Sequence, residues 1–192
     1  GNEVHAVQNL DLGVYAGQVT CLLGHNGAGK STTISMLTGL YPATSGSAWI
    51  TDRSHGAHSI SSGLRNARRL IGVCPQHSVI FPRLTVREHL QLFGELKGND
   101  GRGSTTPLSD TIDALVTAVG LGAKRDTEAG ALSGGMKRKL SVAIALIGDP
   151  RVVFLDEPTS GMDPHSRRAM WDLLRRSREG RALILTTHFM DE

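Results

Sequence analysis

The stretch GHNGAGKS occupies residues 24–31, between an apolar run at 19–23 and a helix-like pattern that follows it. It fits the pattern G-x-x-x-x-G-K-[ST], in which glycines let the backbone approach a phosphate and direct several N–H groups at it. Lys30 supplies a positive charge for the terminal phosphates, and the hydroxyl of Ser31 suits Mg²⁺. The following helix directs its positive end at the anion. The stretch predicts a nucleotide-binding loop formed by Gly24, His25, Asn26, Gly27, Ala28, Gly29, Lys30, Ser31 and Thr32.

A second stretch, VVFLDE at 152–157, places two carboxylates directly after an unbroken apolar strand. Such strands are typical of the middle of a parallel sheet, and residues at their carboxyl ends face the crevice where ligands bind. We expect Asp156 to hold Mg²⁺ and Glu157 to polarise an attacking water as the general base. Acids after an apolar strand are common, so this interpretation depends on the phosphate-binding loop in the same chain.

A third stretch, LSGGM at 132–136, begins another predicted helix. Ser133 is a good N-cap, but Gly134 and Gly135 each cost a helix about 1 kcal/mol relative to alanine. A second phosphate at this helix N-terminus would explain why a bare backbone is needed there. Without the other two motifs, the stretch would be interpreted as an ordinary capped helix.

Strand-like and helix-like segments alternate along the chain. Val86, Leu90, Phe93 and Leu96 recur at helical spacing, and the polar, Gly/Pro/Ser/Thr-rich residues 99–109 indicate a surface loop. This alternation predicts an α/β fold with a largely parallel central sheet. The expected strands are 19–23, 47–50, 70–74, 152–155 and 182–186, and the other expected helices are 29–40, 111–119, 133–147 and 165–177.

Composition narrows the class of protein. The chain has 192 residues, of which 39% are hydrophobic and 20% charged, which indicates one folded domain rather than a disordered polyelectrolyte. The net charge of +3 is too small to indicate nucleic acid, and we expect no nucleic-acid partner. Cys21 and Cys74 are the two cysteines, which excludes a disulfide-rich scaffold and favours a reducing, cytosol-facing compartment.

Taken together, these residues resemble the nucleotide-binding domain of ATP-binding-cassette (ABC) proteins, and LSGGM at 132–136 resembles the signature of that superfamily. The resemblance extends from about Val4 to Glu192. It implies a P-loop NTPase core with a mostly parallel sheet flanked by helices. It also implies an inserted helical subdomain at approximately 81–147, and residues 1–192 as a single ABC ATPase domain.

The resemblance assigns roles to three more residues. Gln76 matches the Q-loop glutamine, which contacts Mg²⁺ and the attacking water and whose loop meets the membrane domains. Asp163, in SGMD at 160–163, matches the D-loop, which crosses to a partner subunit. His188 matches the switch histidine at the γ-phosphate. Without the resemblance, these would be interpreted as a surface residue, a helix cap and a strand-end histidine.

Three stretches narrow the resemblance to the A subfamily of eukaryotic transporters: LGHNGAGK at 23–30, GVCPQH at 72–77 and LSGGMKRKL at 132–140. Those are large chains with two membrane domains and two ATPase domains, mostly moving lipids. CPQH at 74–77 and THFMDE at 187–192 are more similar to the first ATPase domain than to the second.

The subfamily resemblance implies hydrolysis of ATP to ADP and phosphate, with ATP and Mg²⁺ bound on the cytosolic face of a membrane. It also implies transmembrane domains as partners, and head-to-tail pairing with a second ATPase domain, expected in the same parent chain. In such a pair each domain supplies its signature to the other's nucleotide; here these residues are Leu132, Ser133, Gly134, Gly135 and Met136.

The sequence departs from the family pattern in three places. The aromatic residue that stacks on adenine normally lies upstream of where this chain begins, and Tyr15 is too near the phosphate-binding loop to replace it. Strands beyond His188 are absent, and residues 99–109 resemble an insertion. We therefore expect the chain to be a domain truncated at both ends. Three basic groups are expected on solvated helix faces: Arg65/Arg68/Arg69, Lys137/Arg138/Lys139 and Arg175/Arg176/Arg178.

Three alternatives remain open from the sequence. One is a non-transport ABC ATPase that acts on ribosomes or DNA, and another is the ATPase subunit of a drug or polysaccharide exporter. The third is a regulatory cassette that binds ATP without hydrolysing it, against which the intact Lys30, Asp156, Glu157 and His188 argue. The transported substrate cannot be predicted, because the membrane domains choose it.

Overall fold

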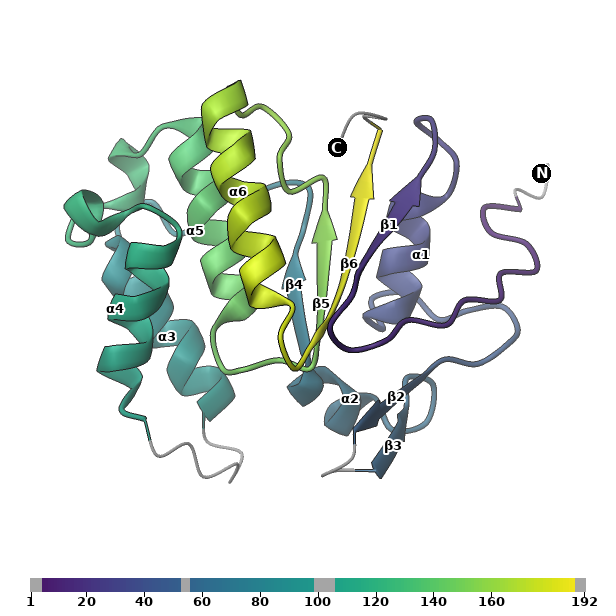
Figure 1. The fold of residues 1–192 in the computed structure, drawn as a ribbon. Coiled ribbons are helices and arrows are strands. Elements are labelled where there is room, and N and C mark those ends of the chain that lie inside the picture. The colour runs from purple at the N-terminus through teal and green to yellow at the C-terminus, as the bar shows by residue number, and fades with distance from the viewer. Residues whose placement is uncertain (1–4, 53–55, 99–105, 189–192) are drawn as a thin grey trace.

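The computed structural model of the chain describes residues 5–52, 56–98 and 106–188 (Figure 1). Strands and helices alternate along most of the chain, as the sequence predicts. The strands are β1 (Val19–Leu23), β2 (Trp49–Asp52), β3 (Gly56–Ser59), β4 (Ile71–Cys74), β5 (Val152–Asp156) and β6 (Ala182–Thr187). The helices are α1 (Lys30–Leu37), α2 (Leu64–Leu70), α3 (Val86–Gly98), α4 (Leu108–Ala118), α5 (Gly134–Leu146) and α6 (Pro164–Ser177), with short 3₁₀ turns at Gly122–Lys124 and Ala129–Ala131.

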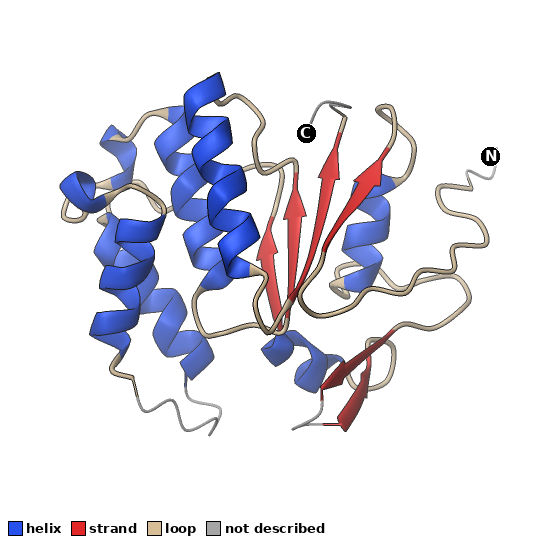
Figure 2. Cartoon of the chain, in the orientation of Figure 1, coloured by secondary structure: helices blue, strands red, loops and turns tan. Residues whose placement is uncertain are grey.

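The centre of the molecule is a four-stranded sheet in the order β1-β6-β5-β4, and all three neighbouring pairs are parallel. In Figure 2 its four arrowheads therefore point the same way. The register pairs Leu23 with Thr187, and Asp156 with Thr186, so the strands end close to one level. This sheet confirms the predicted α/β fold with a parallel core.

Each face of the sheet is covered by helices, because successive side chains of a strand point to opposite sides. Val153 and Leu155 of β5 belong to one buried cluster, together with the apolar sides of α3, α4, α5 and α6. Phe154, between them, belongs to a second cluster formed with α1, α2 and β2. In Figure 1, α5 and α6 accordingly lie on one side of the sheet and α1 on the other.

Helices α3, α4 and α5 pack on one another, and α5 also packs directly against β4. Gly72 makes that contact possible, since a Cβ added there would lie 2.0 Å from the carbonyl oxygen of Ala145. These helices fall within residues 81–147, where the inserted helical subdomain is expected. Among the described residues, no helix is both long enough and apolar enough to span a bilayer.

Some predicted elements differ from the observed ones. Helix α1 ends at Leu37 rather than near residue 40, because Gly39 adopts a left-handed conformation with φ 69°. Helix α4 begins at Leu108, inside the expected loop, and residues 99–105 of that loop lie outside the described residues. The strand expected at 47–50 overlaps β2, but neither its antiparallel partner β3 nor α2 was predicted, because each is short and buries few apolar side chains.

Strand β1 lies at one edge of the four-stranded sheet, although four of its five residues are apolar. Leu23 is 53% exposed and Cys21 is also exposed, whereas Cys74 on β4 is fully buried. Burial raises the pKa of the Cys74 thiol to about 11, which makes it a poor nucleophile. An apolar run of five residues therefore does not by itself distinguish an edge strand from a central one.

The side chain of Lys97 makes the stability of the chain depend on pH. Its Nζ donates to the carbonyl of Ile147 at 3.3 Å, and burial lowers its pKa to about 8. Between pH 8 and 10.5 the unfolded chain holds this proton and the folded chain does not, so this group makes the free energy of unfolding rise with pH. We expect Lys97→Met to stabilise the chain by about 1–3 kcal/mol at pH 7 and by much less at pH 10.

The measurement is urea unfolding of wild type and Lys97→Met at both pH values, with the exposed Lys124→Met as the matched control. If Lys97→Met and wild type differed in free energy of unfolding by the same amount at pH 7 and pH 10, the lowered pKa of Lys97 would be contradicted.

Candidate nucleotide-binding site

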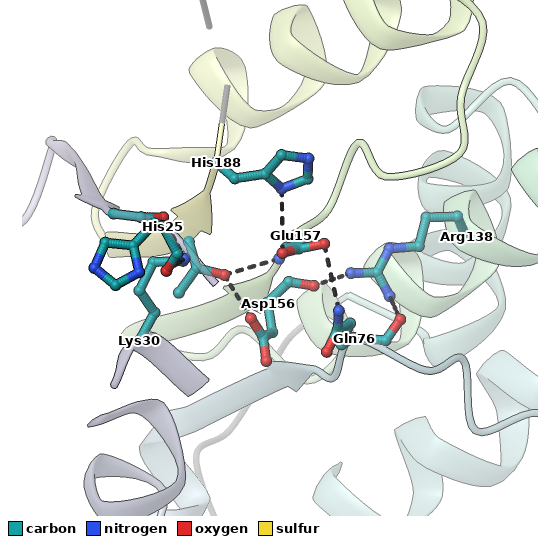
Figure 3. A network of polar contacts seen from close by, with 9 residues as sticks. His25, Lys30, Gln76, Arg138, Asp156, Glu157 and His188 are labelled. Carbon is teal, nitrogen blue, oxygen red and sulfur yellow. Dashed lines mark hydrogen bonds and ion pairs between the residues drawn. The ribbon is translucent and has the colours of Figure 1, made fainter. Parts of the chain in front are cut away.

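The predicted site residues follow the carboxyl ends of the four parallel strands. The loop at 24–31 follows β1, Gln76 follows β4, Glu157 follows β5, and His188 follows β6. Because the strands are parallel, all four ends lie at the same edge of the sheet, where ligands bind in open α/β folds. Figure 3 shows Lys30, Gln76, Asp156, Glu157 and His188 gathered there.

The phosphate-binding loop turns tightly into α1. Gly27 and Gly29 have φ 84° and 85°, a left-handed conformation that favours glycine. A Cβ at Gly29 would also lie 2.2 Å from the carbonyl oxygen of Ala6. The ammonium of Lys30 donates to the carbonyls of Gly24 at 2.5 Å and His25 at 3.0 Å, so the loop curls around its own cation.

Asp156 and Thr186 form a buried pair between the adjacent strands β5 and β6. The Thr186 hydroxyl donates to Oδ1 of Asp156 at 2.5 Å and accepts from the backbone N–H of Glu157 at 3.0 Å. Thr186 is completely buried and Asp156 is 7% exposed. The hydroxyl thus fixes both the carboxylate expected to hold Mg²⁺ and the backbone of the next residue.

The carboxylate of Glu157 lies between two other predicted residues (Figure 3). Its Oε2 accepts from Nε2 of Gln76 at 3.4 Å, and its Oε1 lies 3.3 Å from Nδ1 of His188. Glu157 has φ 50°, a strained conformation for a residue with a side chain, costing about 1–3 kcal/mol. The chain turns sharply after β5, and the carboxylate faces both neighbouring strand ends.

The burial of Arg138 differs from what the sequence predicts. Arg138 was predicted on a solvated helix face, but the structure buries it at 4% exposure. Its guanidinium donates to backbone carbonyls beside Gln76 and Glu157, including that of Asp156 (Figure 3). No local sequence pattern distinguishes Arg138 from its neighbours Lys137 and Lys139. The other two arginine groups, on α2 and at the end of α6, are exposed as expected.

The signature and D-loop residues occupy helix starts. Ser133 caps α5 by accepting from the N–H of Met136 at 3.3 Å, and Asp163 caps α6 by accepting from the N–H of Ser166 at 3.0 Å. The hydrogen bonds from Ser166 lower the pKa of Asp163. Neither capping bond reaches the phosphate-binding loop or the Glu157 side chain, although the backbone N–H of Ser160, in the same D-loop, donates to the Glu157 carbonyl at 3.1 Å. Their predicted roles therefore lie outside the cluster around Glu157.

The two signature glycines have no evident role within the chain. Neither Gly134 nor Gly135 has a positive φ, so their conformations do not require glycine. A Cβ at either position would meet no described atom within 4 Å.

Residues 7–160 match the protein family described as ABC transporter. The chain belongs to the ABC transporter family. Among solved structures, the ATP binding subunit of an ABC transporter superimposes with a TM-score of 0.82 at 27% identity, over 97% of this chain and 74% of that one. A dimeric ATP-binding cassette in a post-hydrolysis state, bound to ADP and phosphate, has the same fold, with a TM-score of 0.80 at 24% identity over 97% of this chain and 81% of that one.

Several curated ABC proteins are similar over nearly the whole chain. The phospholipid-transporting ATPase ABCA3 of Homo sapiens is 50% identical over 97% of the chain. The retinal-specific phospholipid-transporting ATPase ABCA4 of Homo sapiens is 49% identical and member 7 of ATP-binding cassette sub-family A from Mus musculus is 50% identical, each over 97% of the chain. The chain spans only 8–10% of the length of these relatives.

Thr186 was not singled out in the sequence, although a polar residue opposite an acid in a fully buried strand is a usable signal. We expect Thr186→Val to lower the free energy of unfolding by about 2–6 kcal/mol. The valine leaves an oxygen of Asp156 and the N–H of Glu157 without their partner, and each such loss costs about 1–3 kcal/mol. Urea unfolding measures this effect, with Thr186→Ser as the control that keeps the hydroxyl. Equal stability of the two variants would contradict the role of the hydroxyl.

Proposed function

We propose that the chain binds ATP and hydrolyses it to ADP and phosphate. The observation that carries this proposal is the carboxylate of Glu157, which lies within 3.4 Å of both the Gln76 amide and the His188 ring. The three residues follow three parallel strands, at the edge where the loop after β1 turns into α1. A carboxylate in this position is suited to accept a proton from a water that attacks the terminal phosphate.

The residues proposed for Mg²⁺ fit that ion chemically. Asp156 supplies a carboxylate, Ser31 an exposed hydroxyl and Gln76 an amide oxygen, and Mg²⁺ prefers such oxygen ligands. The amide nitrogen of Gln76 donates to Glu157, which leaves its oxygen for another partner. When bound, Mg²⁺ would neutralise charge on the phosphates of ATP. Within the chain, Thr186 holds the Asp156 carboxylate in place.

Pairing with a second ATPase domain is part of the proposal. The glycines at 134 and 135 lower the stability of α5, and among the described residues nothing occupies the space beside them. A helix start with a bare backbone is suited to approach the phosphates of another domain's nucleotide. We place Leu132, Ser133, Gly134, Gly135 and Met136 against that nucleotide, and Asp163 at the contact between the domains.

The resemblance to phospholipid-transporting relatives supports a role in lipid transport. Identity of 49–50% with ABCA3 and ABCA4, whose names describe phospholipid transport, extends along nearly the whole chain. On this proposal the chain is the cytosolic ATPase domain of a membrane transporter and pairs with a second ATPase domain of the same protein. The comparisons favour this reading over the alternatives of a ribosome- or DNA-directed ATPase and of a drug or polysaccharide exporter.

The proposal is tested by Glu157→Gln. The amide keeps the shape of the side chain but cannot accept a proton from water, so we expect ATP binding to persist within about threefold of wild type. Turnover should fall by about 100-fold or more, since a general base contributes about 10²–10⁴ in rate. Nucleotide titration and phosphate release are measured over a range of chain concentrations, because pairing depends on concentration.

Glu179→Gln is the control, because it makes the same exchange at an exposed carboxylate after α6 that is not assigned to the site. Hydrolysis by Glu157→Gln at the wild-type rate would show that Glu157 is not the base. Binding of ATP without turnover at every concentration, even after the second ATPase domain is added, would favour the regulatory cassette instead.

A further inference from the structure

Arg138 is a buried cation that is surrounded by backbone oxygens. Its guanidinium donates to the carbonyls of Pro75, Gln76 (3.1 Å), Asp156 and Pro158 (3.3 Å). Burying a charge is costly unless hydrogen bonds replace its water. Four carbonyl dipoles at the ends of β4 and β5 supply that replacement, so the planar fork of donors is matched to this particular arrangement of backbone.

Two of the four carbonyls flank Glu157. The Asp156 carbonyl belongs to the peptide group whose nitrogen is that of Glu157, and this N–H donates to Thr186. The peptide is therefore held at both ends, by Arg138 and by Thr186. The Pro158 carbonyl, on the other side of Glu157, is held by the same guanidinium. These bonds hold Glu157 at φ 50°, which directs its carboxylate towards Gln76 and His188.

The other two carbonyls fix the segment that carries Gln76. Arg138 holds the carbonyl of Pro75 and that of Gln76 itself. A single side chain thus sets the relative position of Gln76 and Glu157, whose side chains meet at 3.4 Å. In Figure 3 the guanidinium lies to the right of this pair, on the side away from Lys30.

Arg138 also connects this pair to the signature helix. It lies in α5, four residues after Gly134, where the helix begins. Seven residues further on the same face, Ala145 contacts Gly72 of β4 backbone to backbone. Helix α5 thus packs on the sheet near its C-terminal end. Near its N-terminal end, Arg138 bonds to the segments that carry Gln76 and Glu157.

We propose that Arg138, which lies in the signature helix α5, is a positioning residue for hydrolysis that fixes Gln76 and Glu157 relative to each other. This inference rests on the proposed function. It assigns Arg138 no contact with the nucleotide: Arg138 acts through the backbone of the two residues that surround the attacking water. A displacement at the start of α5 would move the guanidinium and with it both residues, so the signature of one domain is linked to hydrolysis at that domain's own site.

The test is Arg138→Lys, which keeps the charge but replaces the fork by a single ammonium that cannot span carbonyls of two strands. We expect kcat to fall by about 10- to 100-fold, since a misplacement of about 1 Å can cost 100-fold in rate. The affinity for ATP should stay within about threefold of wild type, because the loop at 24–31 is unchanged. Lys139→Arg, the reverse exchange at the next position, is the matched control and should leave kcat unchanged.

Titration with ATP gives both the affinity and the fraction of chains that bind, and kcat is expressed per binding chain, so partial unfolding does not imitate the effect. A kcat of Arg138→Lys within about twofold of wild type would overturn the inference. So would a loss of rate accompanied by an equal loss of ATP affinity, which indicates a general structural role. All rates are measured with the second ATPase domain added; absence of turnover by the wild-type chain in that mixture would instead contradict the proposed function, and the inference with it.

Discussion

The parallel pairing of β6 with β1 on one side and β5 on the other is the constraint on which the site depends. It brings Leu23, Asp156 and Thr187 to one edge of the sheet, although Leu23 lies more than a hundred residues before the other two in the chain. Each strand then continues directly into a residue proposed to act on nucleotide. The loop at 24–31 and the carboxylate of Glu157 come together because their strands end together.

This arrangement has a cost at the same edge. The strand ends expose carbonyls and N–H groups that have no partner in the sheet, and a turn at Glu157 adopts a strained φ of 50°. Two buried side chains compensate: Thr186 bonds to Asp156 and to the N–H of Glu157, and Arg138 bonds to four carbonyls. The geometry of the site is thus maintained by the hydrogen bonds of two buried side chains, and not only by apolar packing.

The sequence predicted those parts of the fold that follow local rules. The loop at 24–31, the apolar strand at β5 and the N-cap Ser133 each have a pattern with a direct physical meaning, and the structure places them as expected. Burial of Arg138 could not be predicted, because it depends on four carbonyls from two distant segments. The edge position of β1 could not be predicted either, since it depends on the order of the strands and not on the residues of β1. The roles of Asp163 and of residues 132–136 stay predictions, because they require a second domain.

The most direct measurement of the central claim, that this edge binds the phosphates of ATP, is nucleotide titration of Lys30→Ala. Lys30 is the cation of the loop, and its hydrogen bonds to Gly24 and His25 place it within the curve of the backbone. Charged hydrogen bonds of this kind contribute about 1.5–3 kcal/mol each, so the account predicts that ATP affinity falls by about 10- to 150-fold or more. The exposed Lys124→Ala should bind as wild type does. Affinity of Lys30→Ala within about threefold of wild type would contradict the claim.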